Sequence, residues 1–220
     1  MTQEVLIPKM KKLSKQQRKI KIPVLECLLV LFSILLLIGA TFVNINLKHY
    51  IIPSTLFSGH LNTADFVYSF SIIPQIPALM FICSSLGKKM ASVAVILYIL
   101  CGLFIFPIFA LGGGVQYLAE FSFGYILGYL PAVVVGGSFL HRKYSFLNMF
   151  LAALCAVLII HFLGIIYMIF IALIKHENGT FISGWIHSQS GLKMIYDIVI
   201  SFVLILMGKY INYFLKFVLK

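Results

Sequence analysis

The sequence predicts an all-α integral membrane protein, a bundle of six transmembrane helices with both termini in the cytoplasm. Three observations support this fold class. Of the 220 residues, 61% are hydrophobic and only 10% are charged, which leaves too little polar surface to cover the core of a soluble domain. The apolar residues fall in long runs separated by short polar breaks, and the basic residues gather at alternate breaks.

The apolar runs define the expected helices. A helix needs about 20 residues to cross the hydrocarbon core of a bilayer, and backbone in lipid must satisfy its own hydrogen bonds. We therefore expect a basic N-terminal arm, residues 1–22, followed by a single transmembrane domain, residues 23–220. The predicted spans are residues 23–43, 66–86, 90–110, 123–140, 146–174 and 194–219.

The basic residues predict how the bundle is oriented. Seven of the 17 lysines and arginines lie within the first 21 residues, and others follow the second, fourth and sixth runs. Only Lys48, Lys175 and Lys193 fall on the opposite side. Because cytoplasmic loops carry the excess of lysine and arginine, both termini are predicted inside a multi-pass protein of the inner (cytoplasmic) membrane. The net charge of +11 then indicates contact with membrane lipid, not with nucleic acid.

Little in the chain suits catalysis or cofactor binding. The six acidic residues are scattered, and no HExxH, GxSxG, paired-carboxylate or phosphate-loop pattern is present. The four cysteines lie in apolar runs without the spacing of a metal site, which is typical of small buried hydrophobic residues. We expect no enzyme, no catalytic residue, no metal and no cofactor.

Two segments predict irregular backbone inside an apolar chain. In "IPQIP", residues 73–77, two prolines deny amide donors to a helix. The segment is either a simple kink or part of a cavity that Gln75 faces. Gly112–Gly114 follow Pro107 at the end of the third run. They form either a plain loop or a place where backbone approaches a small molecule closely.

Asp197 is the single residue that most strongly indicates a functional site. It lies near the outer end of the last run, where a carboxylate is costly unless it faces a cavity or a charged partner. Lys193 precedes it by four residues and shares its helix face, so a structural ion pair is the competing interpretation. His161 stands in the middle of the fifth run. A hydrogen bond to a neighbouring helix is favoured over a ligand or a proton relay.

The motifs together resemble a known family. The segments "IPQIPALMF", "LYILCGLFIFPIFALGGGVQYL" and "FGYILGYLPA" are similar to BioY, the biotin-specific S components of energy-coupling-factor (ECF) vitamin transporters. The resemblance covers about residues 68–140. It implies a six-helix bundle that binds biotin near the outer surface and takes up the vitamin. A partner ECF transmembrane protein and two ATPase subunits would energise the transport.

The resemblance also implies a binding site. Biotin has a ring system that suits aromatic walls, here Phe109, Tyr117 and Tyr125. Its ureido group suits Asp197 together with Gln116 or Gln75, and Gly112 and Gly113 would shape the rim. The family's last helix often carries a lysine three residues after the aspartate, where this chain has Ile200. Lys193 is therefore the candidate that binds the biotin carboxylate.

A second function stays open from the sequence. The first helix of S components usually shows alanines four residues apart, which dock on the partner; the nearest match here is Ser33 and Leu37. A self-sufficient transporter of biotin or a similar small carboxylate, coupled to protons through Asp197 or His161, is thus the alternative. The sequence shows no inverted repeat, which counts against it.

Overall fold

The structure, a computed structural model, describes residues 24–50, 66–141 and 145–218. The predicted arm, residues 1–22, lies outside the described residues. The elements in chain order are α2 (Val24–Phe42), β1 (Ile45–Tyr50), β2 (Val67–Ile72), α3 (Gln75–Leu86), α4 (Lys88–Phe104), the 3₁₀ helix η2 (Val115–Ala119), α5 (Phe123–Leu127), α6 (Tyr129–His141), α7 (Phe146–Ile174), α8 (Gly179–Ser190) and α9 (Leu192–Val218).

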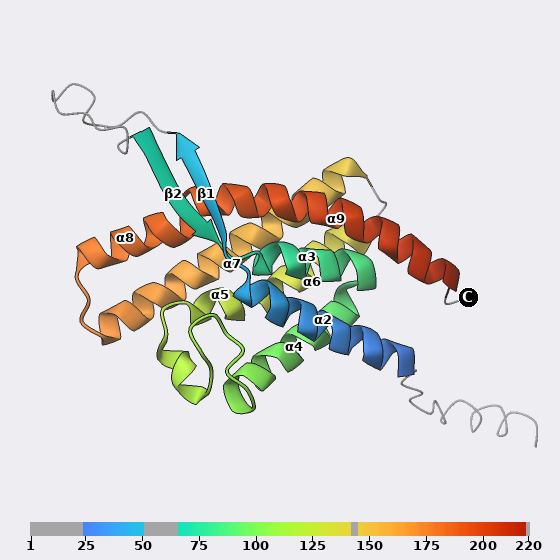
Figure 1. Cartoon of the computed structure of the whole chain (residues 1–220), viewed down its shortest axis with the longest axis horizontal. Helices are drawn as coiled ribbons and strands as arrows, with labels where there is room; N and C mark the ends of the chain where they lie inside the picture. Colours follow the sequence, from blue (N-terminus) through green and yellow to red (C-terminus); the bar gives the residue numbers. More distant parts are fainter. Residues whose placement is uncertain (1–23, 51–65, 142–144, 219–220) are drawn as a thin grey trace, which may run out of the picture.

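The bundle is organised around two helices, α3 and α7 (Figure 1). Helix α7 packs against α5, α6 and α9, and α3 packs against α9, α6, α2 and α4. Nearly all of α3 is buried. At Gly208 of α9, an added Cβ would lie 2.9 Å from the Phe81 carbonyl oxygen of α3. The absence of a side chain there lets these two helices approach closely, which brings the start of α3 beside the start of α9.

The second predicted span, residues 66–86, is not one helix. Its first part is β2, which pairs antiparallel with β1 and places Ile45 opposite Ile72. The sequence VYSFSI of β2 is rich in β-branched and aromatic residues, which favour strands. Pro74 caps α3 and Pro77 lies in its first turn, where an amide needs no acceptor within the helix. The prolines therefore begin a helix and do not kink one.

The other predicted runs are helical: one has the predicted ends, one is divided into α5 and α6, and the rest have shifted ends. Helix α7 matches residues 146–174 at both ends, and the Ser145 side chain accepts from the Asn148 amide as an N-cap. The third run ends as helix at Phe104, six residues early, because a turn that contains Pro107 follows. The last run lies in α9, with the separate helix α8 before it.

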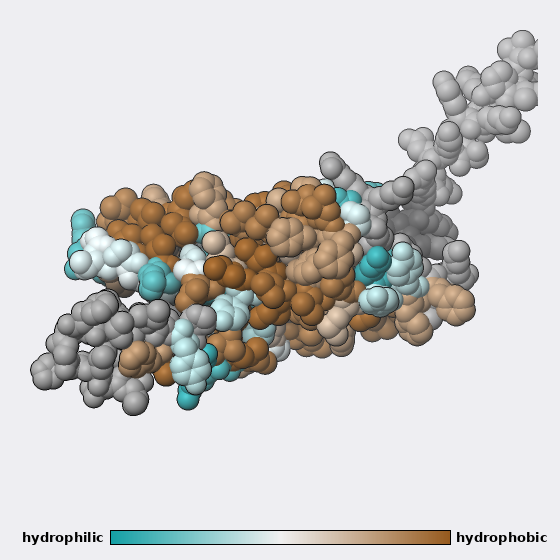
Figure 2. Space-filling model, turned by 90° about the horizontal axis from the view of Figure 1, so that it is seen from above, coloured by the Kyte–Doolittle hydropathy of each residue, from teal (hydrophilic) through white to brown (hydrophobic). Residues whose placement is uncertain are grey.

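The protein is a mainly α-helical, multi-pass membrane protein with one two-stranded sheet. Within the described residues, four helical stretches are long and apolar enough to cross a membrane: residues 24–42, 123–141, 146–174 and 179–215. Large apolar side chains such as Phe32, Phe162 and Val203 are exposed, and Figure 2 shows a broad apolar belt with hydrophilic residues toward its ends. Helix α3, at 12 residues, is shorter than a span. The count of six spans and the cytoplasmic side of the termini stay predictions.

Candidate functional site

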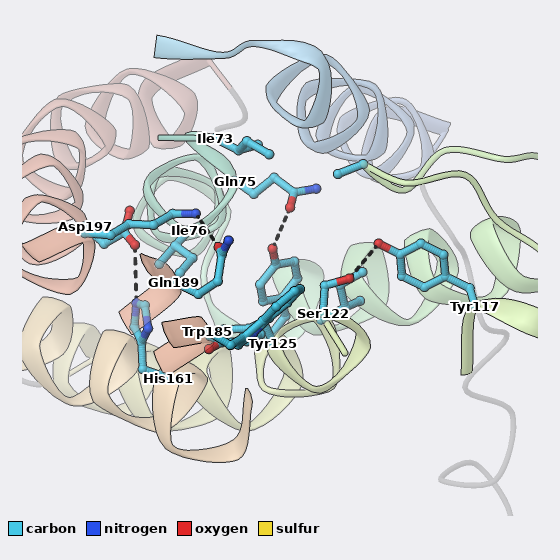
Figure 3. Close-up of a pocket in the computed structure, with 14 residues that line it drawn as sticks. Ile73, Gln75, Ile76, Tyr117, Ser122, Tyr125, His161, Trp185, Gln189 and Asp197 are labelled. Carbon is cyan, nitrogen blue, oxygen red and sulfur yellow. Dashed lines mark hydrogen bonds and ion pairs between the residues drawn. The ribbon is translucent and has the colours of Figure 1, made fainter. Parts of the chain in front are cut away.

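A cavity of about 100 Å³ opens where the first turns of α3 and α9 meet α5, α7 and α8 (Figure 3). Its lining combines aromatic rings, amides and one pair of opposite charges. The lining residues are Ile73, Gln75, Ile76, Ala110, Tyr117, Ser122, Tyr125, Ile126, Tyr129, His161, Trp185, Gln189, Lys193 and Asp197. Five of the nine predicted site residues are therefore brought together: Gln75, Tyr117, Tyr125, Lys193 and Asp197.

Gln75, the first residue of α3, makes hydrogen bonds with both ends of its amide. Its Nε2 donates to Thr41 Oγ1 and, at 2.9 Å, to the Tyr98 hydroxyl. Its Oε1 accepts from the Tyr129 hydroxyl at 2.9 Å. The amide thus joins α2, α3, α4 and α6 in one buried network. Because its groups already have protein partners, Gln75 helps to build the cavity wall and offers little to a ligand.

Asp197 and His161 form the buried charged centre of the cavity. Asp197, on α9, has no exposed surface and His161, on α7, is 2% exposed. His161 Nε2 lies 3.3 Å from Asp197 Oδ2, and His161 Nδ1 lies 2.9 Å from Ser190 Oγ. The other carboxylate oxygen, Asp197 Oδ1, has no hydrogen-bond partner among the residues that the structure describes. An unpaired buried acceptor beside a cavity is costly unless a ligand satisfies it.

Lys193 lies one turn before Asp197 on the same face of α9, as the spacing predicts. Its Nζ donates to Gln189 Oε1 at 3.1 Å. In the part of the chain that the structure describes, Lys193 and Asp197 form no ion pair, since Asp197 pairs with His161. The cavity therefore presents a carboxylate and an ammonium group as separate polar sites.

Aromatic side chains form much of the remaining wall. The Tyr117 hydroxyl lies 3.1 Å from Ser122 Oγ, and burial raises the pKa of Tyr117. Phe109 was predicted to contact the ligand, but it packs behind Tyr117 with ring centroids 4.7 Å apart. It is 1% exposed and lies outside the cavity lining. Phe109 supports the wall from the protein interior.

The glycine-rich turn also lies outside the lining. Phe109 and Gly112 exchange two backbone hydrogen bonds, of 2.8 and 3.0 Å, and the Gly114 amide donates to the Gly102 carbonyl at 2.8 Å. Gly112 and Gly114 have φ angles of 121° and 87°, which favour glycine. A Cβ on Gly113 would lie 2.5 Å from Pro107 Cα. These glycines therefore close a tight turn, and Gln116 beyond it is exposed.

Comparison with known proteins identifies the family. The profile of the BioY family matches residues 10–217, nearly the whole chain. The chain belongs to the BioY family. It also shares its fold with a crystal structure of the S-component for biotin from an ECF-type ABC transporter, at 17% identity and a TM-score of 0.58, over 96% of this chain and 95% of that chain. No sequence among the curated proteins matches it.

Six polar or aromatic residues that line this cavity, or contact a lining residue, were not predicted to bind ligand. His161 was expected to contact a neighbouring helix, which it does, but its place beside Asp197 was not foreseen. The sequence does contain a signal for Trp185 and Gln189. Together with Lys193 and Asp197 they are spaced four residues apart, across the end of α8 and the start of α9. Such spacing indicates one helix face. The six residues are Ser122, Tyr129, His161, Trp185, Gln189 and Ser190.

Proposed function

We propose that this BioY chain binds biotin in the cavity beside Asp197 and serves as the S component of an ECF transporter in the cytoplasmic membrane. The observation that carries the proposal is that Asp197 lines the cavity and that its buried oxygen Oδ1 has no hydrogen-bond partner among the described residues. A ureido N–H group is a matching donor. Family membership and the shared fold support a transport subunit and not an enzyme.

The cavity also offers a donor that the ureido carbonyl requires. The buried indole Nε1 of Trp185 lies near the Tyr125 hydroxyl and makes no hydrogen bond of good geometry among the described residues. With Gln75 engaged and Gln116 outside the lining, Trp185 replaces both glutamines as the proposed donor. One open acceptor and one open donor fit a ureido group, which carries both kinds of hydrogen-bonding group. Tyr117 and Tyr125 flank the fused rings.

Access to the cavity is proposed from the outer side, by movement of α8. About 100 Å³ is small beside the roughly 300–1,000 Å³ typical of ligand pockets, so a ligand must displace part of the wall. Helix α8 carries Trp185 and Gln189, and Ser190 is its one buried residue among those described. A helix with few buried residues moves at low cost.

The energy for uptake is proposed to come from an ECF transmembrane protein and two ATPase subunits. The chain has no phosphate loop of its own, and the shared fold is that of an S component from such a transporter. Ser33 and Leu37 are the nearest match in this chain to the alanines with which other S components dock on the partner. Ser33 and Leu37 of α2 are buried within this bundle, so they are not available to a partner helix.

Biotin binding and vesicle uptake test the proposal together. The purified chain is expected to bind labelled biotin tightly at equilibrium without ATP, while vesicles that contain only this chain accumulate none against a gradient. The buried pair of His161 and Asp197 favours one alternative, proton-coupled transport. Accumulation driven by a proton gradient alone would replace the S-component proposal with that alternative, and failure to bind biotin would refute both.

Replacing Lys193 by glutamine is expected to weaken biotin binding about tenfold and the binding of biotinamide much less. The lysine is the positive charge that lines the described cavity, and a hydrogen bond between charged groups contributes about 1.5–3 kcal/mol. Biotinamide never offers the charge. Dissociation constants for both ligands, measured by isothermal titration calorimetry, check the difference.

The control for this comparison is Lys48→Gln, which removes an exposed lysine of β1 that does not line the cavity. It is expected to leave both affinities unchanged. If Lys193→Gln weakened both ligands equally, the lysine would act through its contact with Gln189. If it weakened neither, the biotin carboxylate would lie elsewhere.

A further inference from the structure

His161 lies between two helices that contribute to the cavity and contacts both. It projects from the middle of α7, while Ser190 ends α8 and Asp197 begins the second turn of α9. Figure 3 shows the His161 ring facing the Asp197 carboxylate. Both ring nitrogens are used, Nδ1 at 2.9 Å from Ser190 Oγ and Nε2 at 3.3 Å from Asp197 Oδ2. The ring is also edge-on to Tyr125, with centroids 5.6 Å apart. Its position is therefore set on several sides.

The direction of these hydrogen bonds follows from the chemistry of the groups. An ionised carboxylate only accepts, so the nitrogen that faces Asp197 carries a proton. In a neutral imidazole the other nitrogen then accepts, here from the Ser190 hydroxyl. Ser190 Oγ in turn accepts from the Tyr125 hydroxyl, 2.8 Å away. With neutral His161, a continuous series of hydrogen bonds runs from the Tyr125 hydroxyl through Ser190 and His161 to Asp197. Each of the two hydroxyls donates one hydrogen bond in this series.

We propose that His161 is a positioning residue for ligand binding: its Nε2–H holds Asp197 Oδ2 and leaves Oδ1, which has no partner among the described residues, as the acceptor for the ligand. The inference rests on the proposed function and names a group that acts on the ligand through Asp197. In this chain Ile200 stands three residues after Asp197, and the structure shows no lysine or arginine paired with the carboxylate among the described residues. His161 takes the place of a direct cationic partner.

The same series of hydrogen bonds connects Asp197, and thus the ligand, to α8. Ser190 is the last residue of α8, the helix that carries Trp185 and Gln189 into the cavity. Through Ser190 and His161, the end of α8 is tied to Asp197. A ligand that binds Asp197 Oδ1 therefore selects the arrangement in which α8 closes the cavity. Loss of the imidazole releases both the carboxylate and the helix end.

A double-mutant cycle on biotin binding tests the positioning role. His161→Leu is expected to weaken biotin about tenfold in the wild-type chain and less than about threefold in the Asp197→Asn background, because residues that act through one another are not additive. His161→Gln retains an N–H donor and is expected to recover most of the affinity. His141→Gln, which changes an exposed histidine at the end of α6, is the control without effect.

Equal losses from His161→Leu in both backgrounds would overturn the proposal, since His161 would then act independently of Asp197. Failure of His161→Gln to recover affinity, in a chain that melts at the wild-type temperature, would also overturn it. If the leucine variant does not fold, the glutamine variant and the tautomer measurement below still decide.

Nitrogen-15 NMR of histidine-labelled chain tests the contact without any ligand. The His161 signals are assigned as those missing from His161→Gln. We expect a protonated Nε2 and an unprotonated Nδ1, and a change in both signals in Asp197→Asn. A protonated Nδ1, or signals that ignore the Asp197 substitution, would refute the hydrogen-bond chain. Because the measurement needs no biotin, it separates failure of this inference from failure of the proposed function.

Discussion

Asparagine in place of Asp197 is expected to weaken biotin binding by the purified chain at least tenfold while the protein stays inserted and folded. The carboxylate has two acceptor oxygens, one held by His161 and one that is buried without a hydrogen-bond partner among the described residues. Asparagine has one oxygen and an NH₂ group. If the oxygen accepts from His161, the NH₂ group faces the ureido N–H and two donors oppose each other. A hydrogen bond to a charged group contributes about 1.5–3 kcal/mol, which is roughly ten-fold to a hundred-fold in affinity.

The ligand supplies the first control for the Asp197 prediction. Biotin methylated on the ureido nitrogens cannot donate to Asp197 Oδ1, so Asp197→Asn is expected to change its affinity little. Ser201→Ala supplies the second control, one turn further along α9. Ser201 Oγ is buried without a partner and does not line the cavity, so its loss is expected to leave biotin binding unchanged. Unaltered biotin binding by Asp197→Asn would remove this residue from the site.

Alanine in place of Gly113 is expected to destabilise the protein by about 1–3 kcal/mol or more, the usual range for overpacking a close-packed interior. The added Cβ would lie 2.5 Å from Pro107 Cα and 2.7 Å from the Gly102 carbonyl oxygen. Both are backbone atoms, which a rotamer change cannot move. The turn must open instead, and with it the support that Phe109 gives to Tyr117. A fall in melting temperature of the detergent-purified chain checks this.

Gly184→Ala is the matched control for Gly113. It lies within α8, where an added Cβ meets nothing within 4 Å, and alanine is the better helix former by about 1 kcal/mol. This variant is expected to melt at or slightly above the wild-type temperature. If Gly113→Ala had the same melting temperature as Gly184→Ala, the turn would have room for a side chain that the structure does not show. A turn that moves without unfolding would show as weaker biotin binding at an unchanged melting temperature.

Several features followed from the sequence because local physics decides them. A long apolar run must form helix in lipid, since no water is present to satisfy its backbone. For this reason α7 appears with the predicted bounds, residues 146–174. The cost of a carboxylate in an apolar segment likewise pointed to Asp197, and the four-residue spacing placed Lys193 on its face. Each of these features depends on the interactions within a single helix, or on the interaction of one residue with its solvent.

Contacts between helices were decided by the tertiary structure alone. The sequence indicated that Gln75 is unusual, but its partners Thr41, Tyr98 and Tyr129 come from three other helices. Residues 66–72 are apolar enough for a span, and pairing with β1 makes them a strand. The glycines that suggested a rim close a turn against Gly102 and Pro107.

The polar centre of the cavity illustrates the division most clearly. His161 lies 36 residues from Asp197 and 29 from Ser190 along the chain, and no pattern in one helix specifies which residue of another it will meet. That choice depends on how side-chain volumes interlock across the bundle. The sequence by itself determined that a buried carboxylate needs a partner in this membrane protein. The packing of α7 and α8 against α9 decided that the partner is a histidine, and that one carboxylate oxygen has no partner among the described residues.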